Sequence, residues 1–379
     1  MQRGNMSRRR FVLTCGAAAG AAALAPRLTG SRAEASLPAG VPEDYIQLNS
    51  NENPYGLTPK ALDAFARAGR VGSRYPDAAE DEMREAIARL HRVKTDQIVL
   101  GCGSSDILRM ADAAFLGGGK TVVAAEPTFE AVLLYAGVMR APAEKVPLTS
   151  DFRHDLPRMA AACSEKTGLV YVCNPNNPTG TVVGADEMAA FLQKVPAATA
   201  VLVDEAYHHF VEDPRYGSAI EELPRHSNLI VARTFSKIYG MAGLRLGYAV
   251  TSEANAAALR RQASWNNTNA AGLSIGLASL ADADVVPSQR QRLNETKRWL
   301  CGELDRQHRR YIPSQANFLM IDVGGDVTPV IAAFRQRRLL VGRKFPSLSN
   351  WLRVSIGTRE QMQAFLEGLQ AIVPAKAAA

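Results

Sequence analysis

The chain has 379 residues, of which 47% are hydrophobic and 21% are charged, values typical of a folded globular protein and not of a disordered or fibrous one. No apolar run reaches the ~18–20 residues that a membrane-spanning helix needs, so we expect no membrane span. The net charge of +7 lies mostly in residues 1–35, which hold six arginines and one acidic residue. The remainder holds 38 basic and 36 acidic residues without a dense basic stripe, which argues against nucleic acid as a partner.

Residues 1–35 have the pattern of an export signal. The pair Arg8-Arg9 precedes a weakly apolar stretch rich in alanine and glycine, and Ala33-Glu34-Ala35 follows as a small-x-small cleavage pattern. The paired arginines resemble a twin-arginine signal, which predicts a periplasmic protein with an N-terminal arm over residues 36–60. A basic tail without a targeting role is the alternative.

Short β-rich runs alternate with helical patterns between residues 95 and 250. The predicted strands are residues 97–100, 121–125, 168–173, 200–203, 228–232 and 246–250. Alternation of this kind predicts an α/β large domain, residues 61–252, whose mainly parallel sheet is covered by helices on both faces.

The pattern changes after residue 252. A long helical stretch is followed by predicted strands at residues 318–323 and 352–356 and by helices at residues 331–338 and 359–372. We therefore expect a smaller C-terminal α+β domain over residues 253–379. Residues 44–56, ahead of the first helix, are expected to form an arm that belongs to neither core.

Several strand ends carry residues of chemical interest, and in open parallel sheets ligands bind at the carboxyl ends of the strands. Lys237 ends the run Thr234-Phe235-Ser236-Lys237 after a buried-looking strand. A lysine in a dry crevice can form a Schiff base with an aldehyde, whereas this lysine taken alone is better read as a solvated surface lysine. Asp204 closes an apolar run, so its carboxylate needs a partner, such as a protonated pyridine nitrogen or a structural salt bridge.

Further residues complete such a site. The glycine-rich turn that contains Ser104 and Ser105 lies between a strand and a helix, where free backbone N–H groups can hold a phosphate. Phe129 could stack on an aromatic ring and Tyr207 could reach a ring hydroxyl, with core packing as the alternative for both. An amine that binds an aldehyde, a carboxylate that binds a ring nitrogen, N–H groups that bind a phosphate and an aromatic ring for stacking together predict a pyridoxal phosphate site.

From about Asn49 to Ile372 the sequence resembles the fold-type I, class I/II aminotransferases, in particular their histidinol-phosphate aminotransferase-like branch. The motifs that carry the resemblance are Leu48–Gly56, Arg74-Tyr75-Pro76, Asn174–Gly180, Asp204–Tyr207, Thr234–Arg245, Ala316-Asn317-Phe318 and Leu352–Gly357. The resemblance implies a transaminase that uses pyridoxal 5'-phosphate to move an amino group between an L-amino acid and a 2-oxo acid.

The resemblance also implies roles for single residues. Lys237 would carry the aldimine and shuttle the proton, and Arg353 would grip the substrate α-carboxylate, with Asn177 and Arg343 also on the substrate side. Tyr55 would reach the partner's phosphate site in a homodimer. The cofactor would be held by Ser104, Ser105, Phe129, Asn177, Asp204, Tyr207, Thr234, Ser236 and Arg245, together with Tyr55 from the partner.

The chain departs from the branch at places that bear on substrate. We find no counterpart of the N-terminal Pro-Tyr motif that helps to bind the substrate phosphate, and residues 343–353 form a shorter segment. Arg343 and Lys344 there either receive an anionic side chain or lie in a solvated loop. Phe345, Trp351 and Tyr75 line an apolar pocket or pack in the core. No Cys/His spacing typical of a metal site is present, so no metal is expected.

The alternatives to general transamination are strict histidinol-phosphate transamination, and decarboxylation, cyclisation or oxidation of an amino acid on the same scaffold. A non-enzymatic ligand-binding protein is the remaining possibility.

Overall fold

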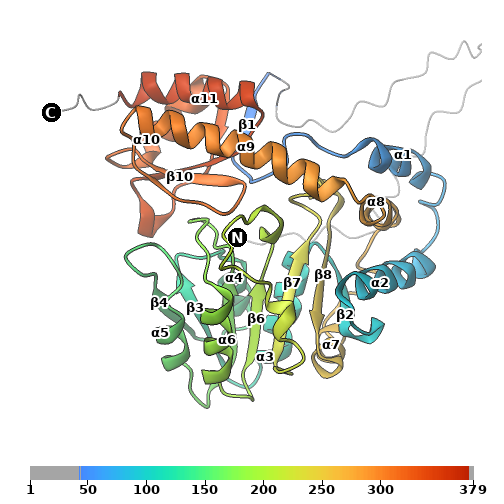
Figure 1. Cartoon of the computed structure of the whole chain (residues 1–379). Coiled ribbons are helices and arrows are strands. Elements are labelled where there is room, and N and C mark those ends of the chain that lie inside the picture. Colours follow the sequence, from blue (N-terminus) through green and yellow to red (C-terminus); the bar gives the residue numbers. More distant parts are fainter. Residues whose placement is uncertain (1–41, 43, 375–379) are drawn as a thin grey trace, which may run out of the picture. The chain divides into compact units, whose positions relative to one another are not determined.

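The computed structural model describes residue 42 and residues 44–374. The predicted signal peptide, residues 1–35, lies outside the described residues, as does the start of the predicted arm. A seven-stranded sheet forms the larger half of the described chain (Figure 1). In spatial order its strands are β2 (Ile98–Cys102), β8 (Leu246–Thr251), β7 (Leu229–Thr234), β6 (Ala200–Asp204), β5 (Thr167–Cys173), β3 (Thr121–Glu126) and β4 (Ala143–Pro147).

This sheet is mainly parallel, as predicted. The pairs β3–β4, β3–β5, β5–β6 and β6–β7 are parallel, and only β8 runs against its neighbours β2 and β7. The carboxyl ends of β5, β6 and β7 therefore meet at one edge, which is where the sequence places its reactive-looking residues.

Helices cover both faces of the sheet because successive strand residues point to opposite sides. Val123 and Val170 face a core that includes α5 (Leu156–Ala161) and α6 (Ala185–Lys194). Val122 and Leu169 face a second core. The helices of this second core are α3 (Ser104–Phe115), α4 (Ala131–Val138) and α7 (Glu253–Arg260).

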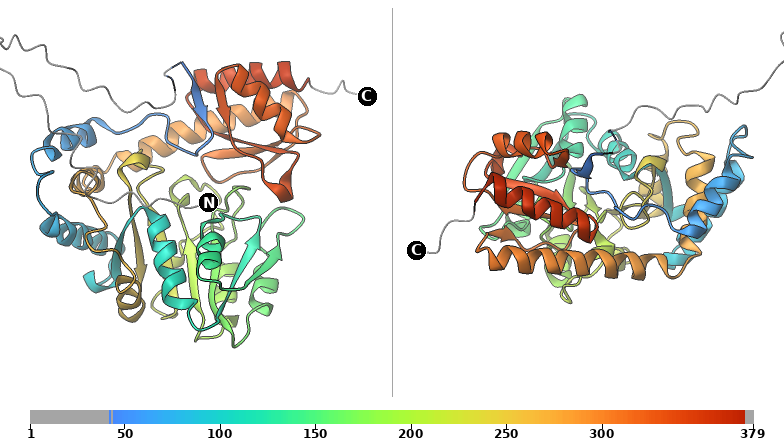
Figure 2. Two further views of the ribbon diagram at one scale, coloured as in Figure 1. Left: turned by 180° about the vertical axis from the view of Figure 1, so that it is seen from behind. Right: turned by 90° about the horizontal axis from the view of Figure 1, so that it is seen from above.

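The smaller half has a three-stranded antiparallel sheet in the order β12 (Trp351–Ser355), β10 (Phe318–Asp322), β9 (Tyr311–Ile312). Three helices accompany it, α9 (Val285–Arg306), α10 (Val327–Gln336) and α11 (Arg359–Ile372). α10 and α11 lie on the side of the sheet away from the large half, whereas α9 runs across to the large half, where Asn294 Nδ2 donates to the Phe210 carbonyl (2.9 Å) (Figure 2). This is the predicted α+β arrangement. The boundary at residue 252 stays a prediction. Two helices that follow it pack on elements that precede it: α7 packs on β2 and β8, and α8 (Ala270–Leu280) packs on α1 (Pro59–Ala68) and α2 (Asp77–His91).

Five short 3₁₀ turns complete the described elements. They are η1 (Thr95–Gln97), η2 (His208–Phe210), η3 (Ala219–Glu222), η4 (Ala242–Leu244) and η5 (Pro346–Leu348). Among the described residues no single helix is long and apolar enough to span a membrane, and the pair α8–α9, bent by 86°, meets that test by length and composition only.

The arm is part of the core, contrary to expectation. Its strand β1 (Ile46–Leu48) pairs in parallel with β11 (Leu339–Val341), and Leu48 is only 1% exposed. Further along the arm, Asn317 Nδ2 donates a hydrogen bond to the Asn51 carbonyl (3.1 Å). The sequence misled because the arm is polar, whereas Asn51 and Asn53 form hydrogen bonds with partners more than 150 residues away.

The arm also packs against the turn that follows Lys237. Gly240 has φ +69°, and a Cβ there would lie 2.3 Å from the Gly56 carbonyl oxygen. We predict that Gly240→Ala lowers the free energy of unfolding by about 2 kcal/mol or more, because of both backbone strain and the clash. Gly243→Ala is the matched control, since a Cβ at Gly243 would meet nothing within 4 Å. Equal denaturation midpoints for the two variants would contradict the prediction.

Candidate active site

A cavity of about 260 Å³ lies at the carboxyl ends of the central strands. Twelve of the thirteen predicted site residues line it: Ser104, Ser105, Phe129, Asn177, Asp204, Tyr207, Thr234, Ser236, Lys237, Arg245, Arg343 and Arg353. The exception is Tyr55. The fold thus gathers residues that are more than 200 positions apart in sequence, while their individual roles stay predictions.

Lys237 lies three residues beyond β7, and its Nζ donates to the Ser50 carbonyl of the arm (3.2 Å). Burial first, and then the nearby cations Arg353 and Arg245, lower the pKa of Lys237 to about 8. A larger share of the amine is therefore unprotonated near neutral pH than in an ordinary lysine, which suits a nucleophile that attacks an aldehyde.

Asp204 is the last residue of β6 and is 2% exposed. Its Oδ2 accepts from the Tyr171 hydroxyl (3.1 Å) and its Oδ1 from the Ala206 amide (3.1 Å). Burial raises the pKa of Asp204 to about 6, although both hydrogen bonds oppose that rise. No basic side chain in the described chain forms an ion pair with this carboxylate, so it is suited to a cationic ligand atom.

The phosphate cradle predicted from the sequence has the shape to hold an anion. α3 begins at Ser104 after Gly103, whose φ is +77°. A Cβ at position 103 would lie 2.2 Å from Arg245 Nη2, so only glycine lets the arginine approach this turn. Arg245 Nη1 also donates to Ser236 Oγ (3.3 Å), and the Ser236 amide donates to Thr234 Oγ1 (3.1 Å). A helix N-terminus, two hydroxyls and a guanidinium thus converge, which is a donor set for a phosphate dianion.

Arg353 projects from β12 and is 8% exposed. Its Nη1 donates to Asn177 Oδ1 (2.8 Å) and its Nη2 to the Asn49 carbonyl (2.9 Å). Its Nε is buried without a hydrogen-bond partner, and no described carboxylate pairs with it. Burial lowers the pKa of Arg353, as expected for a desolvated cation that lacks a counterion. This guanidinium is well suited to bind a substrate carboxylate.

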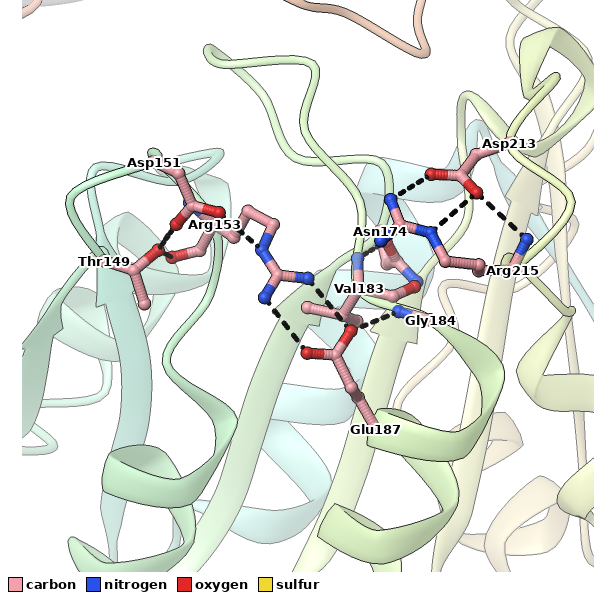
Figure 3. Close-up of polar contacts among 9 residues, drawn as sticks. All are labelled: Thr149, Asp151, Arg153, Asn174, Val183, Gly184, Glu187, Asp213 and Arg215. Atoms are coloured by element: carbon pink, nitrogen blue, oxygen red, sulfur yellow. Dashed lines mark hydrogen bonds and ion pairs between the residues drawn. The ribbon is translucent and has the colours of Figure 1, made fainter.

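The loop that carries Asn177 is fixed at its base (Figure 3). Asn174 Nδ2 donates to the Val183 carbonyl (3.3 Å), and the Val183 amide donates to Asn174 Oδ1 (3.0 Å). The Gly184 amide donates to Glu187 at the start of α6 (2.8 Å). These bonds close the loop between β5 and α6 and hold the Asn177 side chain in place beside Arg353.

Tyr55 does not reach the cavity of its own chain. Its ring is partly buried under the guanidinium of Arg292 on α9, at 3.5 Å from ring centroid to Cζ. Phe345 and Trp351, which the sequence left open, pack in a core cluster and are 3% and 6% exposed. Tyr75 of the Arg-Tyr-Pro motif is 78% exposed.

Sequence reasoning missed the polar residues that support the site. Asn51, 2% exposed, donates through Nδ2 to the Tyr207 hydroxyl (3.0 Å). Tyr171 binds Asp204, yet its place within an apolar strand makes it read as core packing. Glu52 also lines the cavity. Asparagine is common in exposed turns, so the asparagines between Asn49 and Asn53 give no signal of burial by themselves.

The model of the family "Aminotransferase class I and II" matches residues 43–369. The chain belongs to this family. It is 38% identical over 334 residues to a histidinol-phosphate aminotransferase of Moorella thermoacetica, which covers 87% of this chain and 86% of that relative. It is 37% identical over 284 residues to an aromatic amino acid aminotransferase of Cutibacterium acnes, at 75% and 81% coverage.

Solved structures agree with the family. The histidinol-phosphate aminotransferase of Sinorhizobium meliloti, in complex with pyridoxal-5'-phosphate, superposes with a TM-score of 0.81 at 25% identity and covers 88% of this chain and 92% of that one. This aminotransferase therefore has the type I fold of pyridoxal phosphate enzymes, catalyses transamination and uses pyridoxal phosphate. The unpaired carboxylate of Asp204 and the cradle at Gly103 fit that cofactor.

Proposed function

We propose that this aminotransferase acts on free L-amino acids and 2-oxo acids, with Lys237 as its catalytic residue. One observation carries the proposal. Asp204, Lys237 and Arg353 surround one cavity, and none of them forms an ion pair with a described residue. The Asp204 carboxylate suits a ring cation, the free Lys237 amine can condense with an aldehyde, and the Arg353 guanidinium suits an α-carboxylate.

The residues that line the cavity have separate roles in holding the cofactor. Pyridoxal phosphate supplies an aldehyde and an electron-accepting ring. The α3 N-terminus, Thr234, Ser236 and Arg245 would hold the phosphate, and Phe129 would contact the ring. Asp204 would bind the protonated ring nitrogen and keep it charged, while Tyr207 and Asn177 would bind the ring oxygen.

Arg353 orients the substrate. Its planar guanidinium binds the α-carboxylate through two parallel hydrogen bonds, a geometry that lysine does not provide. With the carboxylate held there, Lys237 Nζ would be the group that accepts the proton from the substrate Cα and returns it. The depressed pKa of Lys237 makes this amine an effective base at neutral pH.

The names of the two relatives indicate different amino donors, since one is a histidinol-phosphate aminotransferase and the other an aromatic amino acid aminotransferase. Family membership therefore fixes the reaction and leaves the donor open. Decarboxylation, cyclisation or oxidation on the same scaffold is not favoured, because the relatives that span most of this chain are transaminases.

We predict that the holoenzyme converts its cofactor to the amino form when mixed with its amino acid donor, and returns to the aldehyde form with a 2-oxo acid. Lys237→Ala should lower the rate of each half-reaction by about 10³-fold or more, since it removes both the covalent anchor and the proton-transfer group. Lys60→Ala is the control, because that lysine is 66% exposed and pairs with Asp282. Absorbance follows both half-reactions, and release of carbon dioxide in place of a 2-oxo acid would contradict the proposal.

We further propose that the enzyme is a homodimer in which Tyr55 completes the phosphate site of the partner subunit. Tyr55 lies outside its own cavity, which supports a role in another. Tyr55→Phe is expected to raise the Kd for pyridoxal phosphate about fivefold to tenfold through loss of one charge-assisted hydrogen bond. Tyr311→Phe is the control. A hybrid of Tyr55→Phe and Lys237→Ala subunits should recover one site of normal affinity, and an unchanged Kd in Tyr55→Phe would refute the arrangement.

We also propose that the protein is exported by a twin-arginine route. The Arg8-Arg9 pair and the Ala33-Glu34-Ala35 pattern support this, and the family match begins only at residue 43. Replacing both arginines by lysine should leave the protein in the cytoplasm at its full length. Cell fractionation with antibody detection measures this, and unchanged periplasmic recovery of a shortened protein would rule the route out.

A further inference from the structure

Arg343 lies at the edge of the substrate cavity and is already engaged. Its Nη2 forms an ion pair with Glu130, which directly follows the cavity residue Phe129. Its Nη1 donates to the Lys344 carbonyl (3.2 Å), and its Cζ lies 4.3 Å from the centroid of the Phe345 ring. Three contacts thus hold this guanidinium across the mouth of the cavity.

The neighbouring cation is neutralised in the same way. Lys344 Nζ forms an ion pair with Asp326, the residue before α10. Both basic residues of this segment, which in sequence look ready to receive an anionic side chain, therefore carry a carboxylate partner from the chain itself.

Arg353 makes the contrast clear. It is 8% exposed and pairs with no described carboxylate, whereas the Arg343 side chain is 52% exposed and pairs with Glu130. A second carboxylate, that of Glu52, lines the cavity and forms no ion pair among the described residues. The cavity therefore offers an unpaired cation at Arg353, whereas the charge of Arg343 is already balanced by Glu130.

We propose that Glu130 is a specificity-determining residue that selects against amino acids with an anionic side chain. This rests on the proposed function, in which Arg353 binds the α-carboxylate. Glu130 occupies Arg343 as a tethered carboxylate, so a side-chain carboxylate or phosphate must displace it and then lie beside it. Neutral and cationic side chains meet no such penalty.

The size of the effect follows from the setting. Competition from an exposed ion pair changes the Kd of an anionic ligand by no more than about fivefold. The repulsion between Glu130 and a second anion adds to this effect. Removing the Glu130 charge is therefore expected to favour anionic ligands by about fivefold to tenfold and to leave neutral ones within about twofold.

The test compares binding of two non-reacting acids of equal carbon number, succinate and butanoate, to the holoenzyme by calorimetry. Glu130→Gln should lower the Kd for succinate about fivefold to tenfold relative to that for butanoate. The double variant Glu130→Gln/Arg343→Gln should lose this gain, because the freed guanidinium is gone. In parallel, Glu130→Gln should raise kcat/KM for L-aspartate and L-glutamate relative to L-leucine and L-phenylalanine.

Glu126→Gln is the matched control. Glu126 lies four residues earlier in the same segment and pairs with Lys145, away from the cavity. Its succinate-to-butanoate ratio should equal that of the wild type. An unchanged ratio in Glu130→Gln, or an equal change for both acids, would overturn the proposal. Failure of every amino acid to convert the cofactor would instead refute the proposed function, while the Kd ratio would still report on Glu130.

Discussion

The site depends on burying charge without a partner. Asp204 and Arg353 are 2% and 8% exposed, Lys237 is enclosed with them, and none has an ion-pair partner in the described chain. An uncompensated buried charge costs several kcal/mol, which the folded protein must offset elsewhere. In the proposed function, the cofactor and the substrate supply the missing counter-charges. Their binding then relieves the unfavourable energy of these unpaired charges, which adds to the affinity. Such ligands should also stabilise the fold, because they bind the folded state alone.

The arm makes this strained arrangement rigid. Asn51 links the Tyr207 hydroxyl, which belongs to the large half, to Ser355 on β12 through hydrogen bonds of 3.0 and 3.2 Å. Asn49 supplies a carbonyl to Arg353, whose other donor goes to Asn177. Arg353 is thereby tied both to the arm and to the loop that follows β5. A shift of the small half would break these bonds together, so the arm couples substrate position to cofactor position.

The sequence predicts those features that depend on local pattern. Apolar runs place the central strands correctly, and the parallel arrangement then brings Asp204 and Lys237 to one edge, because strand ends of equal polarity share a side. The predicted final helix, residues 359–372, coincides with α11. The edge strand β4 is missed because Ala143, Glu144 and Lys145 are exposed and give no apolar alternation.

Features that depend on distant partners could not be predicted in this way. The Asn51–Tyr207 hydrogen bond spans 156 positions and the Glu130–Arg343 ion pair spans 213, and neither leaves a periodic trace. Whether Arg343 is free or occupied is decided by where the segment before α4 meets the segment after β11. The sequence therefore predicts a cation near the substrate, but it does not show whether a carboxylate of the same chain neutralises that cation.

Charge placement in the cavity also separates affinity from selectivity. Every substrate of a transaminase carries an α-carboxylate, in the amino acid and in the 2-oxo acid, so in its proposed role Arg353 attracts all of them and discriminates among none. A buried guanidinium with no competing carboxylate gives affinity, because the free-energy cost of removing water from it arose during folding and does not recur on binding. An exposed guanidinium that a neighbouring carboxylate already occupies gives little affinity, since water and Glu130 both compete for it. Its effect is instead a difference between ligands, and such differences are what specificity requires.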